Sequence, residues 1–179
     1  PNNSELEFKR SHKAYGEQVF MVRRLLEFIQ KRRNPVQFWV SRGLTVGKNC
    51  RLVGEVHFGT EPYLISLGDN VSITYSSLIT HDGGVWTVRE RHPNIDLIAP
   101  IKIGNNVFIG WGCLILPGVT IGDNVIVGAG SVVTKNLESN GVYGGNPARL
   151  LKTLRDYEAK VETSGLATKH LSKSEKRNY

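Results

Sequence analysis

The sequence predicts an all-β solenoid in which short flat strands wind three to a coil, with an N-terminal α-helix and a short C-terminal α-helix. The first observation is that aliphatic residues recur every six positions from Ile103 to Val133 without an exception. On an α-helix, residues six apart would point about 120° away from one another, whereas on β-strands an even spacing places them on one face. The period of six therefore predicts strands whose aliphatic side chains form one continuous core.

A longer period is superimposed on the hexads. Tetrapeptides made of an aliphatic residue, Gly, a variable residue and Asn begin at Val46, Leu67, Ile103 and Ile121, at separations of 21, 36 and 18 residues. Eighteen is three times six, so the predicted coil has three strands and three corners, where Gly, Asn and Asp can adopt positive φ. The separation of 21 fits one coil with three added residues.

The separation of 36 allows either two regular coils or one coil with an excursion of about 18 residues. Two regular coils would place Arg91 at an inward position, where an unpaired guanidinium is costly to bury. The same segment contains Pro93 and Pro100. We therefore expect the chain to leave the solenoid as a loop over residues 82–99, within a solenoid domain that extends over residues 36–145.

Residues 1–35 are expected to form an N-terminal helical segment that ends at Asn34-Pro35. Apolar residues recur in it at alternating spacings of four and three. This stripe consists of Tyr15, Val19, Val22, Leu26 and Ile29. We expect the apolar face to pack on the first coil and the basic face to be solvated, with contact between its basic residues and an anionic membrane surface as the alternative.

A short C-terminal helix is expected over residues 146–164, where it caps the other end of the solenoid. Asn146 is placed as its N-cap and Pro147 at its first helical position, and apolar residues follow at helical spacing. The sequence of residues 165–179 is polar and lacks apolar periodicity, which predicts a mobile tail.

The composition is that of an ordinary globular protein with a basic balance. The 179 residues carry 23 Lys and Arg against 16 Asp and Glu, a formal net charge of +7. We expect no nucleic-acid partner, because the sequence has no nucleic-acid fold signature and no basic stripe interleaved with aromatic residues. Cys50 and Cys113 fit neither a disulfide framework nor a zinc site and are interpreted as packing residues. The sequence has no secretory signal and no apolar stretch of membrane-spanning length, so a cytoplasmic location is expected.

Three segments resemble one known family. They are LGDNVSITYSSLITH from Leu67, IKIGNNVFIGWGCLILPGVTIGDNVIVGAGSVVTKN from Ile101 and GGNPARLL from Gly144. In this order they are similar to the hexapeptide-repeat acyltransferases, and more narrowly to sugar O-acetyltransferases of the maltose and galactoside type and of the capsule and O-antigen type. The resemblance extends over about residues 46–151. It implies a left-handed parallel β-helix, a homotrimer, and acetyl transfer from acetyl-CoA to a hydroxyl of a saccharide.

In the family that the chain resembles, a histidine just after this coil is the catalytic base, and it aligns with His81. An acceptor hydroxyl must lose its proton as it attacks, and an imidazole, which titrates near neutral pH, can take it. His81 also stands where the regular wall gives way to the loop. Asp82, Trp86 and His92 are the candidates for acceptor binding, although a neighbour in sequence such as Asp82 points away from the imidazole on an extended chain.

The resemblance also implies where acetyl-CoA binds, without a metal, in a slot between adjacent β-helices. Its phosphates require cations and backbone N–H groups. Carried over from the family, the donor-binding residues are Gly110, Trp111, Gly128, Ala129, Thr134, Lys135 and Arg149. The two glycines and Ala129 would offer backbone to the pantetheine arm, and the last three residues would meet the nucleotide end. Trp111 stands where the family more often has a small residue.

Three alternative functions remain open at this point. The acceptor could be an amine, as in an amino sugar or a xenobiotic. A lyase resembling γ-type carbonic anhydrase would need three histidine ligands on the coils, and the sequence has no histidine between His92 and His170. A non-catalytic β-helix scaffold is the third, because fold alone does not establish function. Thiol release from acetyl-CoA that depends on His81 would separate these alternatives.

Overall fold

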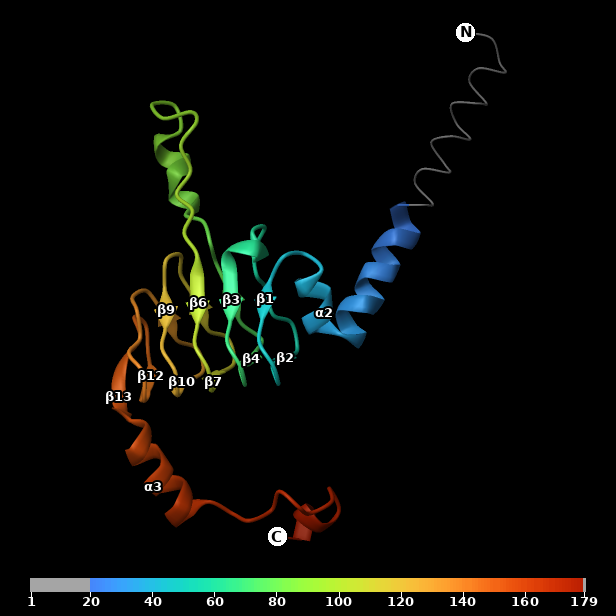
Figure 1. The fold of residues 1–179 in the computed structure, drawn as a ribbon, viewed down its shortest axis with the longest axis vertical. Coiled ribbons are helices and arrows are strands. Elements are labelled where there is room, and N and C mark those ends of the chain that lie inside the picture. Colours follow the sequence, from blue (N-terminus) through green and yellow to red (C-terminus); the bar gives the residue numbers. More distant parts are fainter. Residues whose placement is uncertain (1–19, 179) are drawn as a thin grey trace, which may run out of the picture.

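The computed structural model describes residues 20–178 and forms the body of the protein from three β-sheets (Figure 1). Sheet A consists, in order, of β1 (Thr45–Val46), β3 (Ile65–Leu67), β6 (Ile101–Ile103) and β9 (Thr120–Ile121). Sheet B consists of β2 (Arg51–Val53), β4 (Ser72–Thr74), β7 (Val107–Ile109), β10 (Val125–Val127), β12 (Gly141–Gly144) and β13 (Arg149–Thr153). Sheet C consists of β5 (Ser77–Leu78), β8 (Leu114–Ile115) and β11 (Val132–Val133). All neighbouring strands are parallel except β12 and β13.

The chain visits the three sheets in a fixed rotation. It passes through β6, β7 and β8 and then through β9, β10 and β11, each of which lies beside the strand three earlier in the chain. In register, Ile103 lies beside Ile121 and Ile115 beside Val133, both pairs being 18 residues apart. The prediction of parallel sheets with a helix at each end is confirmed, and the register agrees with three strands in 18 residues.

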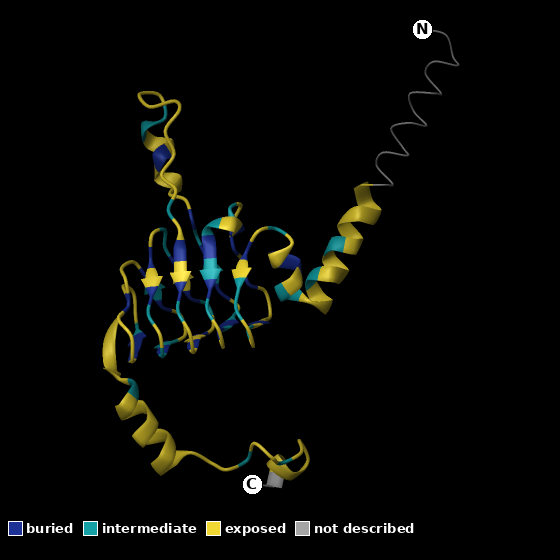
Figure 2. Ribbon diagram, viewed as in Figure 1, coloured by how far each residue is buried: buried dark blue, intermediate teal, exposed yellow. Residues whose placement is uncertain are grey.

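The aliphatic side chains of the hexads form the core between the sheets (Figure 2). Strands β6 and β7 each read buried, exposed, buried, as expected when alternate residues face the core. Among the fully buried side chains are Ile73, Ile109, Ile115, Ile121, Val127 and Val133. Each turn through the three sheets buries its aliphatic layer against the next, which explains why the period persists along the chain.

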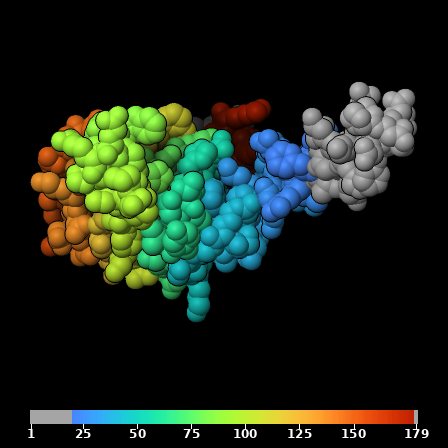
Figure 3. All heavy atoms as spheres, turned by 90° about the horizontal axis from the view of Figure 1, so that it is seen from above, coloured from blue at the N-terminus to red at the C-terminus, as the bar shows by residue number. Residues whose placement is uncertain are grey.

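The 36-residue separation contains one regular turn and an excursion. Leu67 of β3 lies directly beside Ile103 of β6. Residues 82–99 leave the sheets as an arm that projects from the body and contains the 3₁₀ helix η2 (Gly83–Val88) (Figures 1 and 3). Arg91 is exposed in this arm, as predicted from the cost of burying it.

Two helices precede the sheets. The described part of the N-terminal segment is a helix over residues 20–33, and α2 (Pro35–Val40) follows it. Phe38 and Trp39 of α2 are buried, and the Trp39 ring lies 5.1 Å from that of Phe58 between ring centroids. The short helix α2 therefore covers the first strands of the body.

The prediction that the apolar stripe of the first helix packs on the body is wrong. Val22, Leu26 and Ile29 are exposed (Figure 2), while Tyr15 and Val19 lie outside the described residues. The physical reason is that α2 already occupies the apolar end of the first coil. No helix within the described chain is both long enough and apolar enough to cross a bilayer.

At the other end, the C-terminal helix begins at residue 154 and not at residue 146. Residues 149–153 form β13, which pairs with β12 and so covers an edge of sheet B that would otherwise present unpaired backbone groups. Asn146 and Pro147, predicted to start the helix, lie in the turn between these two strands and are joined by a cis peptide bond.

The C-terminal helix α3 (Leu154–Ser164) starts with a capping box. The hydroxyl of Thr153 accepts a hydrogen bond from the Asp156 N–H at 3.1 Å, and the Asp156 carboxylate accepts one from the Thr153 N–H at 3.3 Å. These bonds satisfy N–H groups that have no partner within the helix. The described tail that follows is mostly exposed and contains the 3₁₀ helix η3 (Glu175–Asn178).

Candidate active site

His81 lies at the base of the arm, where both ends of the arm meet. It forms an isolated antiparallel bridge with Ile98. The N–H of Ala99 donates to the carbonyl of Thr80 at 2.8 Å, so the returning chain is tied to the outgoing chain beside His81. The histidine therefore stands on backbone that is fixed by sheet C on one side and by the closed arm on the other.

The imidazole of His81 contacts the carboxylate of Glu61. Nδ1 of His81 and Oε2 of Glu61 are 3.0 Å apart. Glu61 comes from the preceding coil, just before the 3₁₀ helix η1 (Pro62–Leu64). The bridge between His57 and Ser77 shows that the two coils are offset by 20 residues here, and Glu61 and His81 are separated by the same offset. The two side chains thus occupy equivalent corners of adjacent coils.

Glu61 is itself held by two hydroxyl groups. Its Oε1 accepts a hydrogen bond from Thr60 Oγ1 at 2.6 Å, and its Oε2 accepts one from Thr80 Oγ1 at 2.7 Å. These bonds, together with the one to His81, favour the charged form and lower the pKa of Glu61 from 4.5 to about 2. Its carboxylate is therefore ionised at neutral pH, and only 16% of its side chain is exposed.

An ionised carboxylate determines which nitrogen of the neutral imidazole carries the proton. Glu61 can only accept hydrogen bonds, so the bond to His81 requires the proton on Nδ1. Nε2 then keeps its lone pair and can accept a proton. If it does, the imidazolium that results is paired with a negative charge 3.0 Å away. This is the arrangement of a general base with a positioning carboxylate.

A cavity of about 290 Å³ opens beside His81 and Glu61, between the body and the arm. Trp86, which is 82% exposed, contributes its indole to the lining of the cavity. Asp82 and Arg89 contribute polar groups. The volume is at the lower end of that of small-molecule sites. The cavity therefore suits a small polar group, such as one ring of a sugar, rather than a large apolar ligand.

Arg89 holds the arm closed on itself. Its guanidinium donates to the Asp96 carboxylate at 2.7 Å and to the carbonyls of Ile95 and Pro93 at 2.8 and 3.2 Å. Sequence reasoning missed both Arg89 and Glu61. A signal existed for Glu61, since it stands one coil before His81, whereas nothing in the repeat pattern pointed to Arg89.

The other two acceptor candidates have different surroundings. Asp82 caps η2, its Oδ1 accepting from the Gly84 N–H at 2.8 Å, and its hydrogen bond is not to the imidazole. It still lines the cavity with His81. His92 lines a different hollow of about 380 Å³ in the arm, to which His81 does not contribute. The structure thus brings Asp82 and Trp86 to His81 and leaves His92 apart.

The proposed donor site begins at Gly110 and Gly128, where the chain turns from sheet B to sheet C. Their N–H groups already donate to the carbonyls of Val127 and Tyr143 at 2.8 Å each. A Cβ at Gly110 would lie 2.7 Å from the Ala129 nitrogen, so the next coil requires glycine there. In this chain Gly110 permits close stacking of coils, whereas a Cβ at Gly128 would meet nothing nearer than 3.4 Å. Ala129 is the candidate left to offer an N–H group.

Trp111 extends outward beside these glycines. It is 62% exposed, and its ring centroid lies 6.3 Å from that of Tyr75 in the preceding coil. Tyr75 is also exposed and has a φ of 41°. The two rings make an aromatic ledge along one wall of the corner, a feature that the sequence signalled at Trp111 and not at Tyr75.

The cationic candidates Lys135 and Arg149 lie at different margins of sheet C. Thr134 and Lys135 are exposed just after β11, at the corner that carries His81 two coils earlier. Because neighbouring strands are about 4.8 Å apart, these corners are separated by about 10 Å. Arg149 begins β13 and pairs with Gly144 of β12, so it lies at the corner between sheets B and C that also carries Gly128.

The cysteines show no sign of a nucleophile. Cys113 is fully buried, and burial raises the pKa of its thiol. Its Sγ lies 3.2 Å from the carbonyl oxygen of Gly128. The prediction that Cys113 is a packing residue is confirmed. Within residues 20–178, no three His, Cys, Asp or Glu side chains cluster so as to hold a metal ion.

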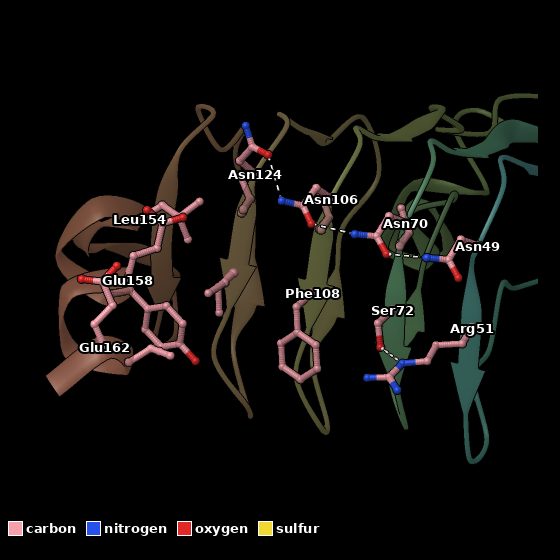
Figure 4. A pocket seen from close by; sticks show the side chains of 16 residues that line it. Asn49, Arg51, Asn70, Ser72, Asn106, Phe108, Asn124, Leu154, Glu158 and Glu162 are labelled. Atoms are coloured by element: carbon pink, nitrogen blue, oxygen red, sulfur yellow. Dashed lines mark hydrogen bonds between the residues drawn. The ribbon is translucent and has the colours of Figure 1, made fainter. Parts of the chain in front are cut away.

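A larger hollow of about 690 Å³ lies between the outer face of sheet B and α3 (Figure 4). Along its rim runs a hydrogen-bonded row of Asn49, Asn70, Asn106 and Asn124, and α3 presents Leu154, Glu158 and Glu162 on the opposite side. Neither a histidine nor a cysteine lines this hollow. His81, the predicted base, lines the smaller cavity and not this hollow.

Known proteins resemble this chain in sequence over its repeats. Residues 100–135 match the family model described as the hexapeptide repeat of succinyl-transferase. Protein CapG of Staphylococcus aureus is 51% identical over 140 residues, which cover 76% of this chain and 81% of that protein. Galactoside O-acetyltransferase of Escherichia coli (strain K12) is 37% identical over 123 residues, which cover 68% of this chain and 60% of that protein.

Known structures resemble it as well. A galactoside acetyltransferase in complex with coenzyme A matches with a TM-score of 0.58 and 31% identity, over 73% of this chain and 74% of that one. A maltose O-acetyltransferase from Clostridium difficile 630 matches with a TM-score of 0.51 and 32% identity, over 65% and 73% of the two chains. With its hexads, its rotation through three parallel sheets and these relatives, the chain belongs to the hexapeptide-repeat acetyltransferase family.

Proposed function

We propose that this protein transfers an acetyl group from acetyl-CoA to a hydroxyl of a saccharide or glycan precursor, with His81 as general base. The observation that carries the proposal is the His81–Glu61 pair, which lines a small cavity together with Asp82, Trp86 and Arg89. An acceptor hydroxyl is too weakly acidic to ionise at neutral pH and needs a base within hydrogen-bond reach. Because the acetyl thioester is already activated, an enzyme nucleophile is not needed.

In this mechanism, the hydroxyl hydrogen-bonds to Nε2 of His81 and gives up its proton as its oxygen attacks the acetyl carbonyl carbon. The new C–O bond forms, the C–S bond of the thioester breaks, and the imidazolium returns the proton to the departing sulfur. Glu61 acts as a positioning residue, since its carboxylate holds the Nδ1 proton and pairs with the imidazolium while the charge exists.

The donor is proposed to bind along sheet C. Trp111 and the Ala129 N–H would contact the pantetheine arm, while Lys135 and Arg149 would meet its phosphates and Thr134 would add a hydroxyl. The exposure of these side chains supports this assignment, as does the position of Thr134 and Lys135 two coils from His81. Gly110 contributes by letting the coils stack, and the N–H groups of Gly110 and Gly128 already donate to the neighbouring coil.

We also propose that the three sheets wind as a left-handed β-helix and that three copies assemble, with the donor slot between neighbours. The similarity to the galactoside acetyltransferase structure supports the winding. The outward apolar residues on the sheet faces, Phe108, Trp111 and Leu114, support assembly, because water-exposed rings and leucines are costly. The free thiols of Cys50 and Cys113 suit the reducing cytoplasm.

A saccharide acceptor is favoured by the shape of the cavity and by what the relatives' names say. Trp86 offers an aromatic face and Asp82 a carboxylate, the two kinds of group that bind a sugar ring and its hydroxyls. The Escherichia coli and Clostridium difficile relatives are named for galactoside and maltose O-acetylation. His92 would contribute only if the arm closed further over the acceptor.

The test is to incubate the protein with acetyl-CoA and a panel of sugars and to detect acetylated products by mass spectrometry. Hydroxylamine treatment of the product then separates the acceptors, because it removes an O-acetyl ester and leaves an N-acetyl amide. We expect a labile product. A stable product would assign an amine acceptor, and no product with any sugar or amino sugar would contradict the transferase proposal.

A further inference from the structure

The helix over residues 20–33 is amphipathic, but it is turned the opposite way from a helix that packs on a core. At 3.6 residues per turn, its apolar side consists of Met21, Val22, Leu25, Phe28 and Ile29, and its polar side of Arg23, Arg24, Glu27, Gln30 and Lys31. Within the described part of this helix, only Glu27 and Lys31 are partly covered, and every other residue is exposed. The side that meets the body is therefore the polar side.

Specific contacts fix this orientation. Nζ of Lys31 lies 3.1 Å from the Glu55 carboxylate of the body and 5.6 Å from the centroid of the Trp39 ring. On the same side, the Glu27 carboxylate lies 3.4 Å from the guanidinium of Arg42. The helix is thus joined to the body by its charges and projects away from the sheets (Figure 1), while Phe28 and Arg32 line a hollow with Leu52, Glu55 and Tyr75 of the body. The apolar residues that face solvent are Met21, Val22, Leu25, Leu26 and Ile29.

Exposed large apolar residues and cations lie together on this helix. Leu25 and Leu26 are 58% and 60% exposed, and Phe20 and Phe28 carry the guanidinium groups of Arg24 and Arg32 over their rings. The cations without a carboxylate partner among the described residues are Arg24, Arg32 and Arg33. Apolar side chains bordered by arginines that stretch along them are typical of a helix lying in the interface of an anionic bilayer.

We propose that this helix docks the protein on the surface of an anionic membrane, its apolar side entering the acyl boundary and its arginines meeting lipid phosphates. Each cation near such a surface and each buried apolar side chain contributes to binding. A second copy of the chain is a poorer occupant, because apposed helices would bring Arg32 and Arg33 against like charges. This inference does not rest on acetyl transfer.

The test is sedimentation of the full chain with vesicles of phosphatidylcholine alone or of phosphatidylcholine with phosphatidylglycerol. We expect binding to the anionic vesicles that weakens as salt is added. Leu25→Glu is expected to weaken this partition at least about tenfold, and Arg33→Glu about tenfold. The matched controls Leu166→Glu and Lys169→Glu change exposed residues in the tail and should leave binding to the anionic vesicles unchanged.

Three outcomes would overturn the proposal: no binding to anionic vesicles, equal losses in Leu25→Glu and Leu166→Glu, or a smaller assembly of Leu25→Glu in sedimentation velocity without vesicles. The last would assign the apolar side to a second copy. Acetyl transfer is measured in a separate experiment from vesicle binding. Leu25→Glu should still acetylate a water-soluble sugar, and His81→Ala should still bind vesicles, so failure of one proposal is distinguishable from failure of the other.

Discussion

Two corners of the molecule are built in opposite ways. The corner between sheets A and B repeats one residue coil after coil, in an asparagine row of Asn49, Asn70, Asn106, Asn124 and Asn140. Each has a φ between 54° and 64°, and successive side chains are hydrogen-bonded at 2.7 to 3.0 Å. The corner after sheet C carries Glu61, His81, Gly118 and Asn136 at equivalent positions and repeats nothing.

The difference shows how a repeat protein separates stability from chemistry. A side chain that recurs in every coil has a partner above and below and satisfies a shared backbone need, in this case a left-handed φ that asparagine tolerates. A side chain that occurs once has no such partner and must be explained by its own neighbours. At the His81 corner those neighbours are a carboxylate and a cavity.

The largest effect is expected from the residue that occurs once. His81→Ala removes the proposed base, so the rate of thiol release from acetyl-CoA in the presence of acceptor should fall by about a hundredfold to ten-thousandfold. The thermal midpoint of unfolding should change little. His170→Ala, at an exposed histidine of the tail, is the matched control and should keep full activity. Equal activity of the two variants would contradict a catalytic role for His81.

Glu61→Gln should have the next largest effect. The amide loses the charge-assisted bond, and its NH₂ group can donate to Nδ1 and stabilise the wrong tautomer. We expect kcat to fall by about tenfold to a hundredfold while KM for acetyl-CoA stays unchanged. Glu61→Asp, which keeps the charge, should recover part of the rate. A fall in the thermal midpoint with unchanged kcat would assign Glu61 to structure alone.

The same carboxylate predicts a pH dependence of stability. The pKa of Glu61 in the folded protein is about 2, below its ordinary value of 4.5, so the folded state holds the proton less readily than the unfolded state. The stability that Glu61 contributes is therefore present above pH 4.5 and is lost as the pH falls toward 2. Denaturant unfolding of the wild type and of Glu61→Gln should converge over this range. A constant difference would contradict the lowered pKa.

A moderate effect is expected where coils stack most closely. Gly110→Ala would place a Cβ 2.7 Å from the Ala129 nitrogen and should lower the free energy of unfolding by about 1–3 kcal/mol. Gly83→Ala is the control in the arm, where a Cβ meets nothing within 4 Å. It should change stability by less than about 0.5 kcal/mol. Denaturant midpoints measure both, and equal midpoints would argue against backbone stacking at Gly110.

The smallest effect is expected in the asparagine row. Asn106→Gly keeps the φ of 54° but loses side-chain hydrogen bonds to Asn70 and Asn124, which should cost about 1 kcal/mol of stability with acetyl transfer unchanged. Asn94→Gly, at an exposed asparagine of the arm, is the control. A loss of activity in Asn106→Gly would mean that the repeated corner also serves chemistry.

The features that repeat could be predicted from the sequence alone. The six-residue period of Ile103 to Val133 specifies which side chains face the core, because the two-residue alternation of a strand is a local property. The same arithmetic placed the arm at residues 82–99, since Arg91 could not be buried. His81 was predicted as the base from the family resemblance and from its place where the period breaks.

Which residues contact each other across coils, and at the two ends of the three-sheet body, depends on the tertiary structure. Glu61 lies beside His81 because this corner has a register of 20 residues, whereas β2 and β4 pair at a register of 21. Residues 149–153 form β13 and not the predicted first part of the C-terminal helix, because pairing with β12 supplies hydrogen-bond partners to an otherwise open sheet edge. The first helix turned its polar side to the body because α2 had already covered the apolar end. Such choices depend on neighbours that are distant in sequence, and local periodicity carries no information about them.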